Sequence, residues 1–437
     1  MTTINTRVMT GFMELLPQDQ ICFNHMLDTI RKSYEQFGFI PLDTPVIERA
    51  EVLFTKAGQE TEKQIYRIDK GETPQALRFD LTVPLARYVS HHFNDLTFPF
   101  KRYHIGKVYR GERPQKGRYR EFYQCDIDII GNESLGLVND AEVVSVINTT
   151  FKKLALGDFT IRINNRKILS GFFAHAGLSE KITDILRIID KLEKIGKEKV
   201  IEELQALGIT TPQAHHIIDF ASLKGAAETV IPSLRMMNIQ NDLFLLGLSE
   251  LEQVVQHLQE LGVQPHNFCI DLSIARGLDY YTGTVFETML NALPHIGSVC
   301  SGGRYDNLAE SFSNKKLPGV GISIGLTRLF SQLKEHNMLP HSTPTIAEVL
   351  IIPLTQTVAY ALDTATTLRN HGHNVQVYLE QAKPKKKIEY AHKLGIPFVI
   401  FIGDDEIAAQ TYTIKNMHTG EQTTLKKEQL TPFFTKN

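Results

Sequence analysis

A dense group of basic side chains is the first feature that could do chemistry. Between residues 101 and 120 a single acid, Glu112, stands among eight Lys and Arg residues: Lys101, Arg102, Lys107, Arg110, Arg113, Lys116, Arg118 and Arg120. Guanidinium groups bind phosphate through paired hydrogen bonds and keep their charge, so this density indicates phosphate recognition. A solvated hairpin can carry the same charge run, and charge alone does not separate the two interpretations. Arg110 differs from the others because it closes a predicted strand.

The second feature is the glycine-rich stretch PGVGISIGLTRLF. Gly319, Gly321, Ser323 and Gly325 alternate with apolar residues, which predicts a strand with one nearly bare face on which a flat ligand can lie. Arg328 falls in the first turn of the helix predicted to follow, where it can reach a phosphate. Strand glycines also mark bulges or close packing. Because the spacing is neither GxxxxGK[ST] nor GxGxxG, a nucleotide here would sit on an antiparallel sheet.

Two segments place polar side chains at the two-residue period of a strand. The polar positions are Arg78, Asp80 and Thr82 in QALRFDLTV, and Gln124, Asp126 and Asp128 in REFYQCDIDII. One face of this sheet is therefore expected to be polar. The loop GERPQKGRY joins KRYHIGKVYR to REFYQ, which predicts an antiparallel hairpin with a long tip.

The segment ARGLDYYTGTVFE adds another cation and two phenol hydroxyls. Arg276 stands just before a predicted strand that carries Tyr280 and Tyr281. Such aromatic pairs are also common as packing residues. SGGRYD, further on, is expected to form a glycine turn. The histidine pairs at 91–92 and 215–216 face apart on a helix, so no metal site is expected.

Length and composition indicate a folded protein of two or three domains. The chain has 437 residues, and 47 Lys and Arg nearly balance 49 Asp and Glu, so any polyanion must be met by local basic patches. Four widely spaced cysteines argue against a disulfide framework and a zinc knuckle. No apolar run is long enough for a membrane helix and no signal peptide is evident, so a soluble, cytoplasmic protein without a membrane partner is expected.

Helical and extended patterns surround the polar strands. Residues 17–37 carry an amphipathic stripe that ends at Gly38, and FIPLDTPVIE beyond it predicts an edge strand or a subunit contact. Residues 165–260 have a helical pattern and are expected to form an inserted domain. A linker at 338–345 precedes a small α/β unit with a parallel or mixed sheet.

Taken together, these segments resemble the class II aminoacyl-tRNA synthetases, and within them the histidine-specific family, over nearly the whole chain. GFIPLDTPVIE, KVYRGERPQKGRYREFYQ and PGVGISIGLTRLF resemble the three class motifs, in that order. ARGLDYYTGTVFE and SGGRYD resemble the two family signatures, and RFDLTVPLARY resembles the amino-acid loop.

The resemblance implies an α+β fold with an antiparallel catalytic sheet flanked by helices, a helical insertion and a small C-terminal α/β domain. The implied divisions are a catalytic domain in two parts, 1–164 and 261–336, an insertion at 165–260, and an anticodon-binding domain at 345–437. Pro45 of the first motif would lie at the interface of a homodimer. The implied activity joins L-histidine to tRNA(His) through a histidyl-adenylate, with ATP as substrate and Mg²⁺ accompanying it.

The resemblance also implies roles for single residues. Arg110 would hold the ATP α-phosphate and the histidine carboxylate, Glu112 would approach the adenine side, Arg276 would be a further cation at the α-phosphate, and Arg328 would take the γ-phosphate. Arg118 would be another substrate contact. The residues implied for histidine are Asp80, Thr82 and Gln124 at its α-amino group, Asp128 and Tyr281 at its imidazole, and Tyr280 as a further contact.

Two departures and two rival functions accompany this interpretation. Thr327 stands where the third motif often has an acid, and Asp80 stands where some members have Glu. One rival is the catalytically silent regulatory subunit of histidine biosynthesis, which shares the catalytic fold; it is expected to lack the terminal domain and the phosphate-binding arginines. The other is a histidine- and RNA-binding sensor, which would need an output domain.

Overall fold

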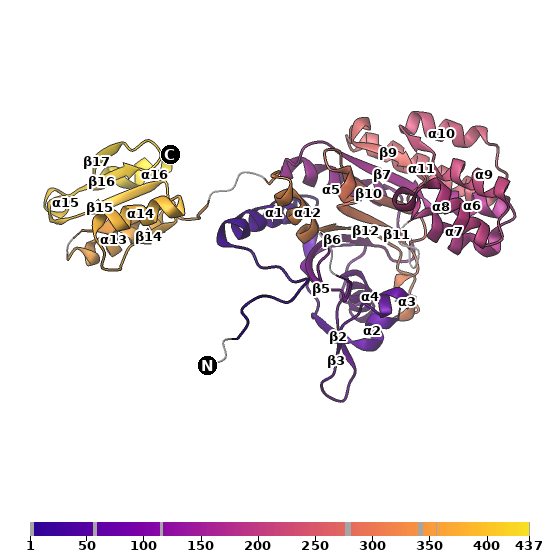
Figure 1. The fold of residues 1–437 in the computed structure, drawn as a ribbon, viewed down its shortest axis with the longest axis horizontal. Helices are drawn as coiled ribbons and strands as arrows, with labels where there is room; N and C mark the ends of the chain where they lie inside the picture. Colours follow the sequence, from indigo (N-terminus) through magenta and orange to yellow (C-terminus); the bar gives the residue numbers. More distant parts are fainter. Residues whose placement is uncertain are drawn as a thin grey trace. The chain divides into compact units, whose positions relative to one another are not determined.

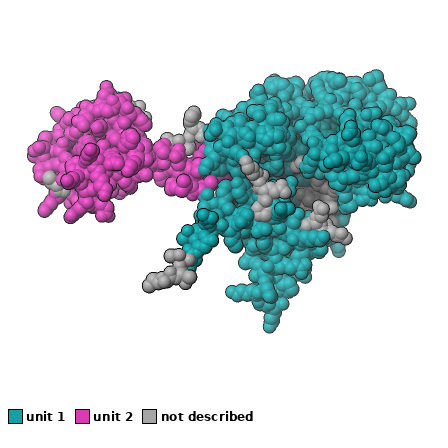
Figure 2. Space-filling view, viewed as in Figure 1, with its two compact units in different colours: residues 1–14, 26–340 teal, residues 15–25, 341–437 magenta. Residues whose placement is uncertain are grey.

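The computed structural model describes residues 4–55, 59–113, 117–275, 281–339, 344–354 and 356–436. The chain divides into two compact units, shown in Figure 2. One comprises residues 1–14 and 26–340, and the other comprises residues 15–25 and 341–437.

A nine-stranded sheet forms the centre of the first unit (Figure 1). Its strands are β1 (Ile40–Pro41), β5 (Phe100–Tyr109), β6 (Glu121–Ile130), β7 (Phe159–Asn165), β8 (Lys224–Gly225), β9 (Phe268–Asp271), β10 (Thr284–Leu290), β11 (Cys300–Tyr305) and β12 (Gly319–Gly325). Their order is β1-β5-β6-β12-β11-β10-β7-β9-β8, and all neighbours are antiparallel except β1 with β5 and β7 with β9. The predicted hairpin is confirmed, because β5 pairs antiparallel with β6 from Phe100↔Ile130 to Tyr109↔Glu121.

Helices cover one face of the sheet (Figure 1). They are α5 (Val138–Leu154), α12 (Leu326–Glu335) and the later part of α1 (Pro17–Gln36). On β6 the apolar set Cys125, Ile127 and Ile129 is fully buried, as the two-residue period requires. The predicted end of the first helix is also confirmed, since Gly38 has φ +76°, a left-handed conformation that favours glycine.

Smaller elements lie over the opposite face of the sheet. They are α2 (Ala50–Phe54), α3 (Gln59–Glu62), α4 (Thr82–His91) and a three-stranded sheet of β2 (Ile47–Arg49), β4 (Gln75–Leu77) and β3 (Arg67–Ile68). β1 is an edge strand of the large sheet and β2 an edge strand of the small one, which confirms the edge position predicted for FIPLDTPVIE.

The helical pattern predicted for 165–260 is confirmed, with one short strand, β8, within it. The helices are α6 (Arg166–His175), α7 (Ile182–Ile189), α8 (Leu192–Ala206), α9 (Thr211–Ala221), α10 (Ala227–Met236) and α11 (Asp242–Glu260). Their status as a separate domain stays a prediction, as do the other domain bounds. None of the described helices is long and apolar enough to cross a membrane.

The second unit contains a mixed sheet in the order β14-β13-β15-β16-β17, as predicted. Its elements are β13 (Val349–Pro353), α13 (Val358–Asn370), β14 (Val375–Val377), α14 (Pro384–Leu394), β15 (Phe398–Ile402), α15 (Asp404–Ala409), β16 (Thr411–Asn416), β17 (Gln422–Lys426) and α16 (Leu430–Lys436). β14, β13 and β15 are parallel, and β16 and β17 are antiparallel. On β13, Val349 and Ile351 belong to one apolar core, and Leu350 and Ile352 to another on the opposite face.

The strand expected over QALRFDLTV is wrong beyond Leu77. Helix α4 begins at Thr82, and its first turn is capped because the Asp80 carboxylate accepts a hydrogen bond from the Val83 amide at 3.1 Å. Leu85 and Val89 continue a buried stripe at helical spacing. This segment therefore forms a helix with an apolar face, although its residues also alternate with the two-residue period of a strand.

The glycine turn expected at SGGRYD is also wrong. The first five of these residues belong to β11, and only the last, Asp306, lies after the strand. A Cβ at Gly302 would lie 2.0 Å from the carbonyl oxygen of Gly321 on β12. The glycines here permit close approach of two strands. The strand after ARGLDYY is likewise shorter than expected, since β10 begins at Thr284 and Tyr281 precedes it.

Candidate active site

A cavity of about 460 Å³ opens on the face of the large sheet opposite α5 and α12. Nine of the eleven site residues predicted from the sequence line it: Asp80, Thr82, Arg110, Glu112, Arg118, Gln124, Asp128, Tyr281 and Arg328. The other two, Arg276 and Tyr280, lie outside the described residues. Among the predicted residues, the cavity thus brings together positions up to 248 residues apart (Asp80 to Arg328).

Strands β6 and β12 form the floor of the cavity. Gln124, Asp126 and Asp128 point to this face of β6 and pair across the ladder with Gly325, Ser323 and Gly321, respectively.

The bare face predicted for β12 is only partly open. A Cβ at Gly319 would lie 2.3 Å from the ring of Tyr305, and a Cβ at Gly321 would lie 2.2 Å from a carboxylate oxygen of Asp128. At Gly325 the nearest such atom is 4.0 Å away. Two of these glycines therefore make room for protein side chains, and only Gly325 leaves space for a ligand.

Arginine side chains line one part of the cavity. Arg110 donates from Nε to the Phe79 carbonyl at 3.0 Å, and its guanidinium lies 5.1 Å from the centre of the Phe122 ring. Arg328 is in the first turn of α12, as predicted, and donates to the carbonyl of Ile296. These backbone and ring contacts fix the direction in which each cation enters the cavity.

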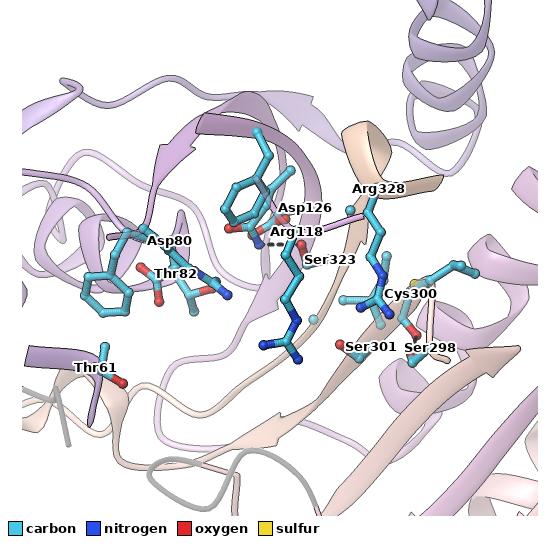
Figure 3. Close-up of a pocket in the computed structure, with 18 of the residues that line it drawn as sticks. Thr61, Asp80, Thr82, Arg118, Asp126, Ser298, Cys300, Ser301, Ser323 and Arg328 are labelled. Carbon is cyan, nitrogen blue, oxygen red and sulfur yellow. Dashed lines mark hydrogen bonds between the residues drawn. The ribbon is translucent and has the colours of Figure 1, made fainter. Parts of the chain in front are cut away.

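Arg118 lies between the two sides of the cavity in Figure 3, with Asp80 and Thr82 on one side and Arg328 on the other. Its Nη1 pairs with a carboxylate oxygen of Glu112 at 3.2 Å. Glu112, which was predicted to approach the adenine, therefore contacts Arg118 of the hairpin loop.

Three aspartates, Asp80, Asp126 and Asp128, gather at the other side of the floor around one buried cation. Arg102 of β5 is fully buried, and its Nη2 lies 2.6 Å from Oδ2 of Asp128. Tyr305 donates its hydroxyl to Oδ1 of the same carboxylate at 2.6 Å. The cavity thus combines three arginines, Arg110, Arg118 and Arg328, with an inner end of buried aspartates. Arg110 is close to this end, because it opposes the rise in the pKa of Asp80.

Burial raises the pKa of all three carboxyl groups at this inner end. The pKa of Asp126 is raised to about 7, because burial outweighs the opposing effect of Arg102. The pKa of Asp80 is raised to about 6, with the Val83 amide and Arg110 opposing the effect of burial. The pKa of Asp128 is raised too, against the effects of Arg102 and Tyr305. Such displaced values are typical of functional sites.

Two neutral side chains make hydrogen bonds in and near the floor, and of these only Gln124 lines the cavity. Gln124 donates from Nε2 to the Ser323 hydroxyl at 2.6 Å, and its Oε1 is buried without a hydrogen-bond partner among the described residues. Thr327 accepts a hydrogen bond from the backbone amide of Tyr123 at 2.8 Å. Thr327, which stands where the third motif often has an acid, thus still forms a local hydrogen bond that connects α12 to β6.

Several lining residues were not among the predicted site residues. They include Asp126, Ser323, Thr61, Gln64, Tyr119, Phe122, Ser298, Ser301 and Tyr305. Asp126 and Ser323 carried a signal, since the strand period places each on the polar face. The sequence gives no such signal for Thr61 and Gln64, because no motif or alternation around them indicates that they line the cavity.

The described residues contain no group of three or more His, Cys, Asp or Glu side chains that could hold a metal ion. The chemistry that the site supports is binding of a polyphosphate next to a ligand that carries an amine and other hydrogen-bond donors.

Comparison with known proteins identifies relatives over both units. Residues 11–329 match the family described as histidyl-tRNA synthetase, and residues 348–437 match the anticodon binding domain. The histidine–tRNA ligase of Clostridium tetani is 57% identical over 427 residues, which are 98% of this chain and 97% of that protein.

Solved structures show the same likeness. The crystal structure of histidyl-tRNA synthetase from Nostoc sp. PCC 7120 has a TM-score of 0.92 at 43% identity and covers 99% of this chain and 100% of that one. A Bacillus halodurans chain described as an ATP phosphoribosyltransferase regulatory subunit/histidyl-tRNA synthetase has a TM-score of 0.76 at 21% identity, covering 92% and 99%. At that identity the likeness shows the fold alone, and nothing here favours the regulatory alternative.

Proposed function

Because this chain belongs to the histidyl-tRNA synthetase family, we propose that it activates L-histidine with ATP and transfers it to tRNA(His), releasing pyrophosphate and AMP. The observation that supports this most directly is that one cavity combines arginines, among them Arg110 and Arg328, with buried carboxylates, among them Asp80 and Asp128. ATP would lie along the arginines, and histidine would lie over the carboxylates.

The arginines would stabilise the first chemical step. Attack of the histidine carboxylate on the α-phosphorus builds negative charge in the transition state, and a fixed guanidinium stabilises it without reorganising. In this proposal Arg110 contacts the α-phosphate and the histidine carboxylate, Arg276 is a second cation at the α-phosphate, and Arg328 binds the γ-phosphate. Glu112 and Arg118 lie toward the adenine.

The inner end would hold the amino acid. Asp80, Thr82 and Gln124 would receive the α-amino group, the ring would extend toward Asp128 and Tyr281, and Tyr280 would be a further histidine contact. An ammonium group balances a buried carboxylate such as Asp80, which otherwise bears the cost of desolvation. ATP in this family generally comes with Mg²⁺, which neutralises phosphate charge, and the protein's part is to orient the phosphates with its arginines.

The second unit would bind the tRNA anticodon. Lys383, Lys385 and Lys386 are exposed at the start of α14, where they can meet RNA phosphates. We further propose a homodimer in the cytoplasm. Ile40 and Ile47, from the segment of the first motif, are 52% and 48% exposed, which suits an interface. Light scattering at micromolar concentration should give twice the mass of the chain; a monomer there would exclude the dimer.

The decisive experiment is ATP–pyrophosphate exchange with a panel of amino acids. Exchange should depend on L-histidine, and Arg276→Ala should nearly abolish it, with a loss of about a hundredfold or more. Exchange with a different amino acid would exclude the assignment. Absence of exchange, with charging of tRNA absent as well, would point to the silent regulatory alternative.

A further inference from the structure

Two histidines from distant segments meet at the surface of the first unit. His295 is the central residue of the 3₁₀ turn Pro294–Ile296, and His336 directly follows the last residue of α12. Their Nε2 atoms lie 3.2 Å apart. The ring planes are inclined by 53° with their centres 5.1 Å apart, so the rings meet through their nitrogens and do not stack. His295 is exposed and His336 is half-buried, so solutes can reach the pair.

The second nitrogen of His336 fixes which of its atoms carries the proton. Its Nδ1 lies 2.9 Å from the carbonyl oxygen of Gln332, one turn earlier in α12. A carbonyl oxygen only accepts hydrogen bonds, so Nδ1 is the donor and the Nε2 of the neutral ring has a lone pair. Histidines that bind metals are commonly oriented by such a hydrogen bond from the other ring nitrogen to a backbone carbonyl. The nitrogen of His336 that faces His295 is therefore ready to act as a ligand.

The distance between the two nitrogens suits a shared metal ion. Zinc binds imidazole nitrogen at about 2.0–2.1 Å in tetrahedral geometry, so two ligand nitrogens on one ion lie about 3.3–3.4 Å apart. The 3.2 Å between His295 and His336 is close to this value. Without an ion the same distance suits an N–H···N hydrogen bond, in which His295 donates. Because His295 is exposed, its proton can move to Nδ1, where water accepts it, and its Nε2 then becomes the second ligand.

The end of α12 favours a cation, and the ligand type selects which one. His336 follows the C-terminal turn of this ten-residue helix, where the helix dipole is negative. Imidazole nitrogen suits zinc, copper and nickel, whereas Mg²⁺ prefers oxygen ligands. Two histidines leave two positions of a tetrahedral ion for water. The pair is therefore matched to a divalent transition metal and not to the Mg²⁺ that accompanies ATP.

We propose that His295 and His336 form a binding site for a divalent transition-metal ion such as zinc. The two histidines are 41 residues apart in the sequence, which is why no motif announces the site. Neither is among the described residues that line the large cavity. The 3₁₀ turn already contacts the start of α12, because the Ile296 carbonyl accepts a hydrogen bond from Arg328. An ion on His336 would add a contact at the other end of α12 and so stabilise this part of the first unit.

The test is titration of the full chain, without a polyhistidine tag and without ATP, with zinc in a calorimeter. The affinity of the tightest zinc site should fall at least about tenfold in His295→Ala and in His336→Ala, because loss of even an outer-shell partner of a metal ligand costs 10- to 100-fold. Zinc should also raise the transition temperature of the wild type more than that of either variant. With one equivalent of Cu²⁺, electron paramagnetic resonance should show coupling to two imidazole nitrogens, and either substitution should remove this signal.

His266→Ala is the matched control. His266 is also exposed and is also the central residue of a 3₁₀ turn that begins with proline, Pro265–Asn267. This variant should bind zinc as the wild type does. Equal zinc affinity in the wild type and in His336→Ala would overturn the inference, as would a wild type that binds no zinc at micromolar concentration. If His336→Ala does not fold, the same comparison with His295→Ala decides. None of these measurements uses catalysis, so failure of the proposed function would be seen separately, in the exchange assay.

Discussion

The guanidinium of Arg102 on β5 lies 2.6 Å from the carboxylate of Asp128 on β6, and both side chains are buried. The two residues are direct partners in the antiparallel ladder. A buried charge pair is costly to disrupt by removing one partner, because the other charge remains without compensation. This pair therefore fixes the inner wall of the proposed histidine site.

Replacing the cation of this pair should destabilise the first unit. Arg102→Met fills a similar volume but leaves Asp128 buried and unpaired, so the free energy of unfolding should fall by about 3–5 kcal/mol. Calorimetry would measure this as a lower transition temperature. Arg187→Met is a suitable control, since Arg187 is 56% exposed and its one ion-pair partner within the described part of the chain is Asp184. Equal transition temperatures for both variants would contradict the structural role of Arg102.

Two glycines of β12 should respond differently to the same substitution. Gly321→Ala would place a methyl group 2.2 Å from the Asp128 carboxylate and 2.4 Å from the carbonyl of Ile127, so it should lower the transition temperature and weaken histidine binding. Gly325→Ala meets nothing closer than 4.0 Å, so its thermal stability should match the wild type. Because this methyl group points into the ligand space, the KM for ATP should rise. Equal transition temperatures for the two variants would show that the two glycines do not differ in this way.

The proposed site should depend on pH through Asp80. Its pKa is raised to about 6, so the carboxylate that would bind the α-ammonium group is lost as the pH falls below that value. The KM for histidine should then rise about tenfold per pH unit. Asp80→Asn keeps an oxygen that can accept the hydrogen bond from the Val83 amide, but it does not ionise. Its KM for histidine should therefore be high at every pH.

The ratio of the wild-type KM to the Asp80→Asn KM isolates this residue, because the imidazole of the substrate titrates equally in both assays. This ratio should increase as the pH is lowered from 7 to 5. A ratio independent of pH would mean that the Asp80 carboxylate does not bind the amino group.

The lysines of α14 should separate into structural and exposed types. Lys387 differs from the exposed Lys383, Lys385 and Lys386, because it is only 8% exposed and its ammonium donates to the Pro353 carbonyl at 2.8 Å. Lys387→Ala leaves that carbonyl without its donor and should destabilise the second unit by about 1–3 kcal/mol.

Lys385→Ala is the comparison, because Lys385 is exposed on the same helix. It should keep the transition temperature and the rate of ATP–pyrophosphate exchange, while the KM for tRNA rises and becomes less dependent on salt. A tRNA KM equal to that of the wild type would argue against a phosphate contact at this position.

Local regularities let the sequence predict much of this architecture. The strict alternation of REFYQCDIDII predicted which face of β6 is polar, and Gln124, Asp126 and Asp128 do point into one cavity. The same rule misled at RFDLTV, where Asp80 caps a helix. Alternation over a few residues cannot be told from a helix cap followed by a helix, because the contacts that decide between them lie outside the segment.

The sequence by itself determined the order of the elements, the polar face of the central hairpin and the resemblance that named the family, because all of these depend on residue types at short, fixed spacings. Only the tertiary structure decided which oxygens of the three aspartates are engaged. That depends on Arg102 and Tyr305, which reach Asp128 from two other strands. Hydrogen bonds between strands are set by register and side-chain direction in space, and these are fixed only once the sheet has formed.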